Sequence, residues 1–243
     1  MIREKSIVKN SWLWCFILGL AVLVYGQFLT SIFPTDSANY QPGYGAPILA
    51  LEFARTPADL EALLGGASDP QREHRIAAMD KGQKLDFLFA VLYSSFLAWF
   101  FIAAKRAGAS FNSRLLVGLC ILAGSADIVE NIILLDITAD IVKPRWLAYL
   151  AYPVNLKFIC LAVTGVMAGV LLFREVQLNH NKRAWKVLAV AIMLSPLFIL
   201  AGLINPAEFG SALILALSVC WPGILLYAGV QAFANSWIKI NKN

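Results

Sequence analysis

Charged residues are scarce in this sequence. Only 14% of its 243 residues are Asp, Glu, Lys or Arg, while 59% are hydrophobic and the mean hydropathy is +0.69. Soluble domains typically carry about 25% charged residues, so the composition excludes an ordinary soluble domain and predicts a multi-pass membrane protein. The formal net charge of +5 does not indicate a nucleic-acid partner, because the basic residues stand in short clusters beside apolar runs, where they act as topology signals.

Residue patterns that carry catalysis or bind metals are also absent from the sequence. Neither of the two histidines lies in a long apolar run, and no H-E-x-x-H, Cys/His or G-x-S-x-G pattern occurs. The cysteines form no C-x-x-C pair, and each falls in a separate apolar run: Cys15, Cys120, Cys160 and Cys220. We therefore expect no metal, no cofactor, no disulfide and no thiol chemistry, and an enzyme ranks below a non-catalytic role.

Long apolar runs are what the sequence does contain. A helix needs about 20 apolar residues to cross a bilayer, and by that measure the chain is one all-α membrane domain, 1–243, with six spans. The first run is too long for a signal peptide. Between the first and second spans lies a polar segment, 34–83, in which Thr56-Pro57-Ala58-Asp59 predicts the start of a short helix. The expected spans are roughly 12–33, 84–104, 115–136, 146–173, 186–204 and 211–234.

The basic residues predict the orientation of these spans. Lys and Arg cluster before the first span, after the second, after the fourth and at the C-terminus. These four segments fall on one side of the membrane, which the positive-inside rule makes cytoplasmic. We expect a cytoplasmic (inner) membrane protein of a bacterium, with both termini inside and segment 34–83 outside.

Three polar residues interrupt the third span. Asp127, Glu130 and Asn131 are spaced i, i+3 and i+4, so they share one face of a helix. A charged side chain near the bilayer centre costs roughly 2.5–3.5 kcal/mol on insertion scales. This face must therefore point into the bundle, and it is the candidate functional site.

A lysine in the fourth span supplies a partner for these acids. Counted at about 1.5 Å per residue, Lys157 lies about 17 Å from the outer end of its span, near the depth of Asp127. An ion pair between them follows, with Glu130 as the alternative partner. Asn155 is a further candidate, but two residues apart on a helix it and Lys157 point to nearly opposite sides.

Two residues of the second span extend this polar region outward. Asp86 lies near the outer end of the span, and Tyr93 follows seven residues later on the same face. Together with Asp127, Glu130, Asn131 and Lys157 they predict a pocket that opens to the outside, with Asp86 at its mouth. The competing interpretation is a buried salt bridge that only fixes how the helices pack.

The chain resembles a family of bacterial multi-pass membrane proteins that carry an Asp-x-x-Glu-Asn motif in a transmembrane helix and have no established activity. The resemblance covers about residues 48–173 and is carried by Leu51-Glu52, Leu85-Asp86-Phe87-Leu88-Phe89, Tyr93, Ala126-Asp127-Ile128-Val129-Glu130-Asn131 and Lys157. It implies that these positions form a shared polar core. Alkaline ceramidase-type membrane hydrolases are excluded, because their histidine ligands have no counterpart in these spans.

The function expected from the sequence is binding of a small polar or amphipathic ligand, such as a lipid headgroup, in this outward-facing pocket. Two alternatives stay open: a proton-coupled small-molecule carrier, and a structural or accessory subunit with a buried ion pair. The expected partners are membrane lipids and the ligand, without nucleic acid, and a homo-oligomer is a further alternative.

The predicted orientation can be checked with reporter fusions. A phosphatase that is active only outside the cytoplasm should be active when fused after Gly66 and silent when fused after Arg183, because these positions fall on opposite sides. The reverse pattern would overturn the orientation, and with it the outward-facing pocket.

Overall fold

The computed structural model describes residues 2–34, 39, 42–178 and 183–240, and the described part contains helices and no strands. Six of the helices, α1, α4, α5, α6, α7 and α8, are long and apolar enough to cross a membrane, so the expected all-α bundle of six transmembrane helices is confirmed. The elements in chain order are α1 (Ile2–Thr30), the 3₁₀ turn η1 (Pro42–Tyr44), α2 (Pro47–Glu52), α3 (Pro57–Leu64), α4 (Arg72–Arg106), α5 (Ser113–Ala139), η2 (Leu147–Tyr149), α6 (Ala151–Leu178), α7 (Arg183–Ile204) and α8 (Pro206–Ile240).

The six long helices form a closed ring. Each packs mainly on two others, in the order α1, α4, α5, α6, α7, α8 and back to α1. Large aromatic and aliphatic side chains such as Phe96, Phe100 and Ile224 are buried, whereas Val24, Ile132 and other apolar residues lie exposed on the helices. Exposed apolar side chains at this density are what a lipid-facing surface requires.

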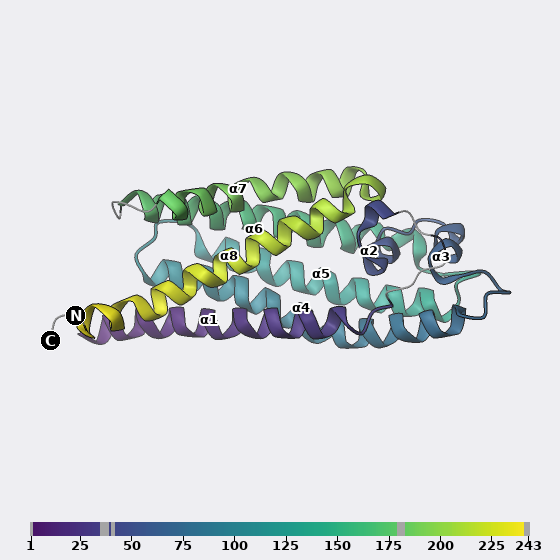
Figure 1. Ribbon diagram of the computed structural model, residues 1–243, viewed down its shortest axis with the longest axis horizontal. Helices are drawn as coiled ribbons and strands as arrows, with labels where there is room; N and C mark the ends of the chain where they lie inside the picture. Colours follow the sequence, from purple (N-terminus) through teal and green to yellow (C-terminus); the bar gives the residue numbers. More distant parts are fainter. Residues whose placement is uncertain (1, 35–38, 40–41, 179–182, 241–243) are drawn as a thin grey trace.

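The two ends of the bundle differ (Figure 1). The start of α1 and the end of α8 lie at one end, the terminal end, while α2 and α3 lie at the other, the α2–α3 end. Since α4 runs toward the terminal end and α5 runs back from it, the α4–α5 connection shares the terminal end with both chain ends. This is the arrangement that the basic clusters predict.

Helix α4 extends well beyond its expected span at the α2–α3 end. It has 35 residues, about 52 Å at the usual rise per residue, against a hydrocarbon core of about 30 Å. Its start is held by Asp69, which accepts hydrogen bonds from Gln71 N at 2.8 Å and from Arg75 Nη1 at 2.8 Å. The bond from Arg75 holds the pKa of Asp69 below its ordinary value. These bonds let the helix begin in water, ahead of the apolar run.

The predicted helix after Thr56 is α3. The Thr56 hydroxyl accepts from Asp59 N at 3.3 Å, and the Asp59 carboxylate accepts from Thr56 N at 2.8 Å. This reciprocal capping box satisfies two amides at the helix start. The leucines of α3 are buried in the protein rather than exposed to lipid: Leu60, Leu63 and Leu64.

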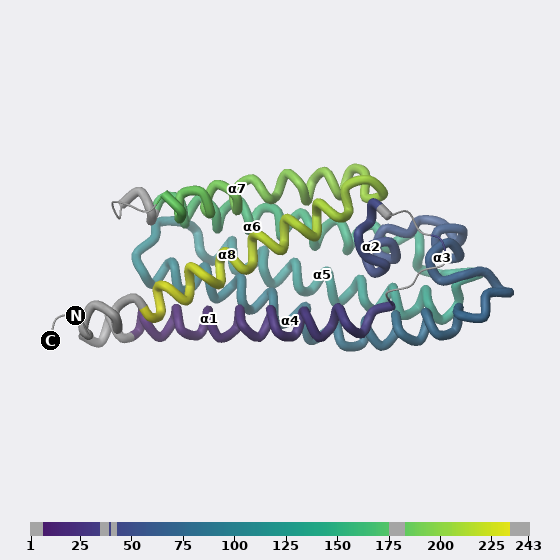
Figure 2. The backbone as a smooth tube through the Cα atoms, in the orientation of Figure 1, coloured from purple at the N-terminus to yellow at the C-terminus, as the bar shows by residue number. Residues whose placement is uncertain are grey.

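Helix α2 was not predicted, and it packs into the bundle end. It begins at Pro47, lies against α5 and α8, and buries Leu51 and Glu52. The ring of Phe53 stacks on Phe158 of α6 at 6.0 Å. Arg55 Nη1 donates to the carbonyl oxygens of Glu52 at 3.1 Å and Ala54 at 2.7 Å, which caps the last turn of α2. The backbone trace in Figure 2 shows α2 beside the turn between α7 and α8.

Gly124 of α5 allows a close approach of α4 and α5 near the polar residues of α5. A Cβ atom at Gly124 would lie 2.7 Å from Ser94 Oγ, 2.8 Å from Ser94 Cβ and 3.1 Å from the carbonyl oxygen of Ala90. Only a residue without a side chain lets the two helices approach this closely.

We expect Gly124→Ala to destabilise the protein by about 1–3 kcal/mol, because overpacking a close contact forces the backbone to shift. The matched control is Gly118→Ala in the same helix, where an added Cβ would meet nothing within 4 Å. Thermal unfolding in detergent measures both, and equal midpoints for the two variants would contradict the proposed close contact.

Candidate functional site

The side chain of Lys157 lies at the centre of the polar cluster. Its Nζ atom is 2.8 Å from Glu130 Oε1, 3.1 Å from Asp127 Oδ1 and 3.3 Å from Glu52 Oε2. The predicted pair with Asp127 is therefore confirmed, and Glu130 binds the same ammonium group. Lys157 Nζ donates hydrogen bonds to Glu130 and Asp127, while Glu52 lies at ion-pair distance.

Helix α5 supplies the acids because its polar spacing matches its buried face. The side chain of Asn112 caps the helix start by accepting from Leu115 N at 3.2 Å. The exposed fractions of Asp127, Glu130 and Asn131 are 4%, 1% and 1%. The i, i+3, i+4 pattern read from the sequence is thus the face that α5 turns into the bundle, toward α4 and α6.

Glu52 also belongs to the cluster, although it was not among the candidate residues found in the expected spans. It is 8% exposed and comes from α2, the short helix outside the spans. Burial raises the pKa of its carboxyl group, and the nearby Lys157 opposes that increase. Its presence in the sequence resemblance was the available signal, together with an acid inside the apolar run Leu49-Ala50-Leu51-Glu52-Phe53-Ala54.

Asp86 and Asn131 connect α4 to α5 beside the cluster. Asn131 Nδ2 donates to Asp86 Oδ2 at 2.8 Å, and Asp86 is only half-buried. Asp86 is therefore less buried than the acids that contact Lys157. This agrees with its expected position at the mouth of the predicted pocket.

Tyr93 lies deeper on the same helix. It is 1% exposed, and its ring stacks on Trp221 of α8 at a centroid distance of 5.2 Å. Its hydroxyl group lies near Asp127 but makes no hydrogen bond of acceptable geometry. An unpartnered buried hydroxyl costs about 1–3 kcal/mol, so this group requires an explanation.

Two further polar residues extend the α4–α5 contact toward the α2–α3 end. Thr138 Oγ1 donates to Asp80 Oδ1. Between Asp80 and Asp86 on α4 lies Gln83, which is 0% exposed and whose amide oxygen and nitrogen both lack a hydrogen-bond partner. From Asp80 to Tyr93 this row of polar groups, the α4–α5 polar row, spans about 20 Å along the helix.

Asn155 is not part of the cluster. Its side chain is exposed while Lys157, two residues later on α6, is 5% exposed. A regular helix turns these two positions about 200° apart, so only one of them can face α5. The structure gives that place to Lys157.

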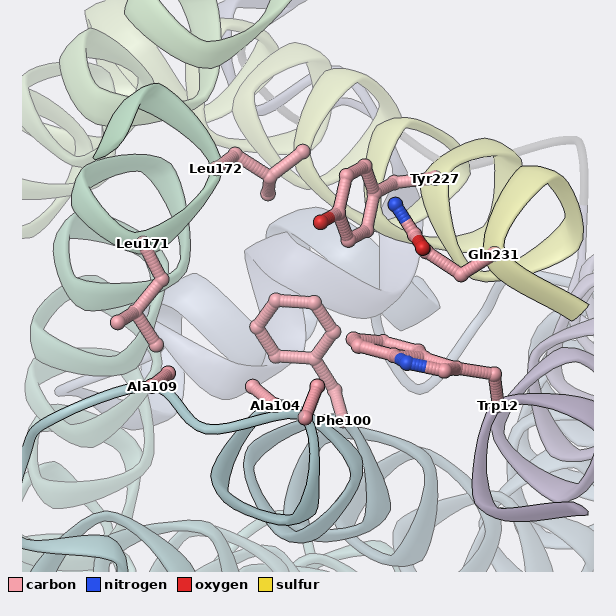
Figure 3. Close-up of a pocket in the computed structure, with 9 residues that line it drawn as sticks. Trp12, Phe100, Ala104, Ala109, Leu171, Leu172, Tyr227 and Gln231 are labelled. Atoms are coloured by element: carbon pink, nitrogen blue, oxygen red, sulfur yellow. The ribbon is translucent and has the colours of Figure 1, made fainter. Parts of the chain in front are cut away.

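A cavity at the terminal end is separate from the polar cluster (Figure 3). It is lined mainly by aromatic and aliphatic side chains, among them Trp12, Phe100, Leu171 and Tyr227, and its volume is about 40 Å³. Sites for small molecules usually enclose about 300–1,000 Å³, so this cavity is a packing gap between α1, α4, α6 and α8. Among the described residues, no group of three or more His, Cys, Asp or Glu side chains is arranged to hold a metal ion.

Replacing the central cation should reveal how the cluster is coupled. We expect Lys157→Met to destabilise the protein by about 3–5 kcal/mol, because it leaves buried carboxylates without a cation. Adding Asp127→Asn should recover part of the loss, since it removes one orphaned charge. Thermal unfolding of the two single variants and the double variant measures the coupling, with Lys143→Met at an exposed loop position as the control. Strictly additive losses would show that Asp127 and Lys157 are not coupled.

Comparison with protein-family models, with curated proteins and with solved structures found no match for this chain. The resemblance described from the sequence therefore stays an expectation.

Proposed function

We propose that this multi-pass membrane protein binds a small polar or amphipathic ligand, such as a lipid headgroup, in the polar cluster around Lys157. The ligand enters from the α2–α3 end, which the distribution of basic residues makes the external side of a bacterial inner membrane. Segment 34–83 then lies outside and covers the entrance.

The observation that carries this proposal is a set of buried polar groups that the ion cluster does not use. Gln83 and Tyr93 are buried, and neither the amide of Gln83 nor the hydroxyl of Tyr93 has a partner. Native proteins leave few such groups, and each calls for an explanation such as a missing ligand or water. A polar ligand with its own donors and acceptors would satisfy either residue, and one that contacts both must extend about 15 Å along α4.

The position of these groups supports an entry route. The α4–α5 polar row begins with Asp80 and Thr138 near the α2–α3 end and leads past Asp86 and Asn131 to Tyr93. Asp86 is half-buried, so it is more accessible than the acids around Lys157. A salt bridge that only fixes helix packing needs no such row.

A proton-coupled carrier is the second candidate, and the surplus of carboxyl groups supports it. Glu52, Asp127 and Glu130 contact a single cation, Lys157. Carboxyl groups buried together do not all remain ionised, and a group that gains and loses a proton during a cycle could couple proton movement to transport.

The binding proposal is tested by removing one hydroxyl group. Tyr93→Phe keeps the ring stacked on Trp221 and deletes only an unpartnered buried group, so we expect its stability to equal or exceed that of the wild type. Bound lipid or metabolite, measured by native mass spectrometry after gentle detergent extraction, should fall at least several-fold. Tyr152→Phe is the matched control, because Tyr152 is 72% exposed.

A second variant tests the entrance. Asp86→Asn should fold normally and lose bound ligand together with whatever phenotype the wild-type gene restores to a deletion strain. If the wild type retains no ligand, or if Tyr93→Phe and Asp86→Asn retain as much as the wild type at matched expression, the binding proposal is wrong and the structural interpretation replaces it.

A further inference from the structure

The charges of the cluster around Lys157 do not balance. Glu52, Asp127 and Glu130 would bring three negative charges against the single positive charge of Lys157, whose Nζ atom they all contact. Arg55 acts on Glu130 only through space, because its guanidinium group donates to the backbone oxygens of Glu52 and Ala54 and lies over the ring of Phe53. Buried like charges at contact distance cannot all persist.

Two oxygen atoms of the cluster also lack hydrogen bonds. Glu130 Oε2 is buried and has no partner. Glu52 Oε2 lies within ion-pair distance of Lys157 Nζ, at 3.3 Å, but outside hydrogen-bonding geometry. Both residues are more than nine-tenths buried, at 1% and 8% exposed. An ionised carboxylate can only accept hydrogen bonds, so neither oxygen can satisfy the other while both groups are charged.

The two acids are neighbours on different elements. Glu130 belongs to α5 and Glu52 to α2. Each has an oxygen within 3.3 Å of the same nitrogen atom, and the side chain of Glu130 lies within hydrogen-bonding reach of Glu52. Asp127 accepts a hydrogen bond from Lys157, and Asp86 accepts one from Asn131. The hydroxyl of Tyr93, near Asp127, completes the polar groups around the pair.

We propose that Glu52 and Glu130 form a proton-binding site, in which one proton is held between their carboxyl groups and joins α2 to α5. The proton makes one group a donor and the other an acceptor, which satisfies the two unpartnered oxygens with a single hydrogen bond. It also reduces the net charge of the cluster by one. Carboxyl pairs at contact distance share a proton in this way, because both cannot ionise together.

This proton would fix the position of the external segment. Glu52 is the last residue of α2. It forms an ion pair with Lys157, and the ring of the next residue, Phe53, stacks on Phe158 of α6. The shared hydrogen bond is then a polar attachment of α2 to the spanning helices. A proton held between Glu52 and Glu130 requires no bound ligand. Its presence is therefore tested independently of the proposed ligand binding.

Infrared spectroscopy of the purified wild-type protein, in a detergent without ester groups, tests the proposal first. A protonated carboxylic acid has a C=O stretching band that a carboxylate lacks, and the band shifts when H₂O is replaced by D₂O. We expect such a band at neutral pH. Its absence from the wild-type spectrum overturns the proposal without reference to any variant.

Variants then assign the proton. Because one proton belongs to both groups, Glu52→Gln and Glu130→Gln should each abolish the band, while Glu61→Gln at an exposed position of α3 should leave it unchanged. Loss of the band in only one of the two variants would show that the proton is not shared, and persistence in both would place it elsewhere.

The attachment of α2 gives a second measurement. Glutamine resembles a protonated glutamic acid and can donate to the partner carboxylate, so Glu52→Gln should leave the rate of proteolysis in segment 42–64 close to that of the wild type. Glu52→Ala should raise it several-fold, because no donor or acceptor remains. Equal rates for the two variants would show that this hydrogen bond does not hold α2.

Discussion

The contact of one buried ammonium group with three carboxyl groups is the constraint on which the rest of the structure depends. Lys157, on α6, contacts Asp127 and Glu130 of α5 and Glu52 of α2. A charge removed from water costs several kcal/mol unless it is paired and hydrogen-bonded. The contact therefore fixes the rotation of α5 and α6, since turning either helix would carry an unpaired charge toward lipid.

The same contact explains why the described part of segment 34–83 packs against the long helices. Its helix α2 brings a carboxyl group to Lys157, and its apolar residues pack on α5, α6 and α8. The capping box at Thr56 and the capping of α2 by Arg55 hold the chain in the required path. The segment thus covers the polar cluster, and any ligand that reaches Lys157 from the α2–α3 end must pass it.

Helix positions and the α5 face could be predicted because they follow from local periodicity. Apolar runs indicate the six long helices, and i, i+3, i+4 spacing places Asp127, Glu130 and Asn131 together. Depth along the spans was sufficient to pair Asp127 with Lys157. Helix geometry indicated that Asn155 and Lys157 point apart, but Asn155 was kept as a candidate, and that prediction was wrong. Glu52 could not be found this way, because no periodicity determines where a segment between two spans folds back. Gln83 was missed for a related reason. It is one of many polar residues in the first part of α4, and no spacing pattern distinguishes it from the others.

The ion cluster around Lys157 is compatible with a ligand-binding site and with a purely structural contact. Buried polar groups without hydrogen bonds distinguish these two interpretations. A cluster that serves only packing gains nothing from the hydroxyl of Tyr93 or the amide of Gln83, because each is buried without a hydrogen bond and so destabilises the folded state relative to an apolar side chain of similar shape. The ring of Tyr93 would stack on Trp221 equally well without its oxygen. Buried polar groups that destabilise the ligand-free protein are explained if they form hydrogen bonds with a ligand. The α4–α5 polar row is the feature that supports the proposed binding site over a purely structural contact.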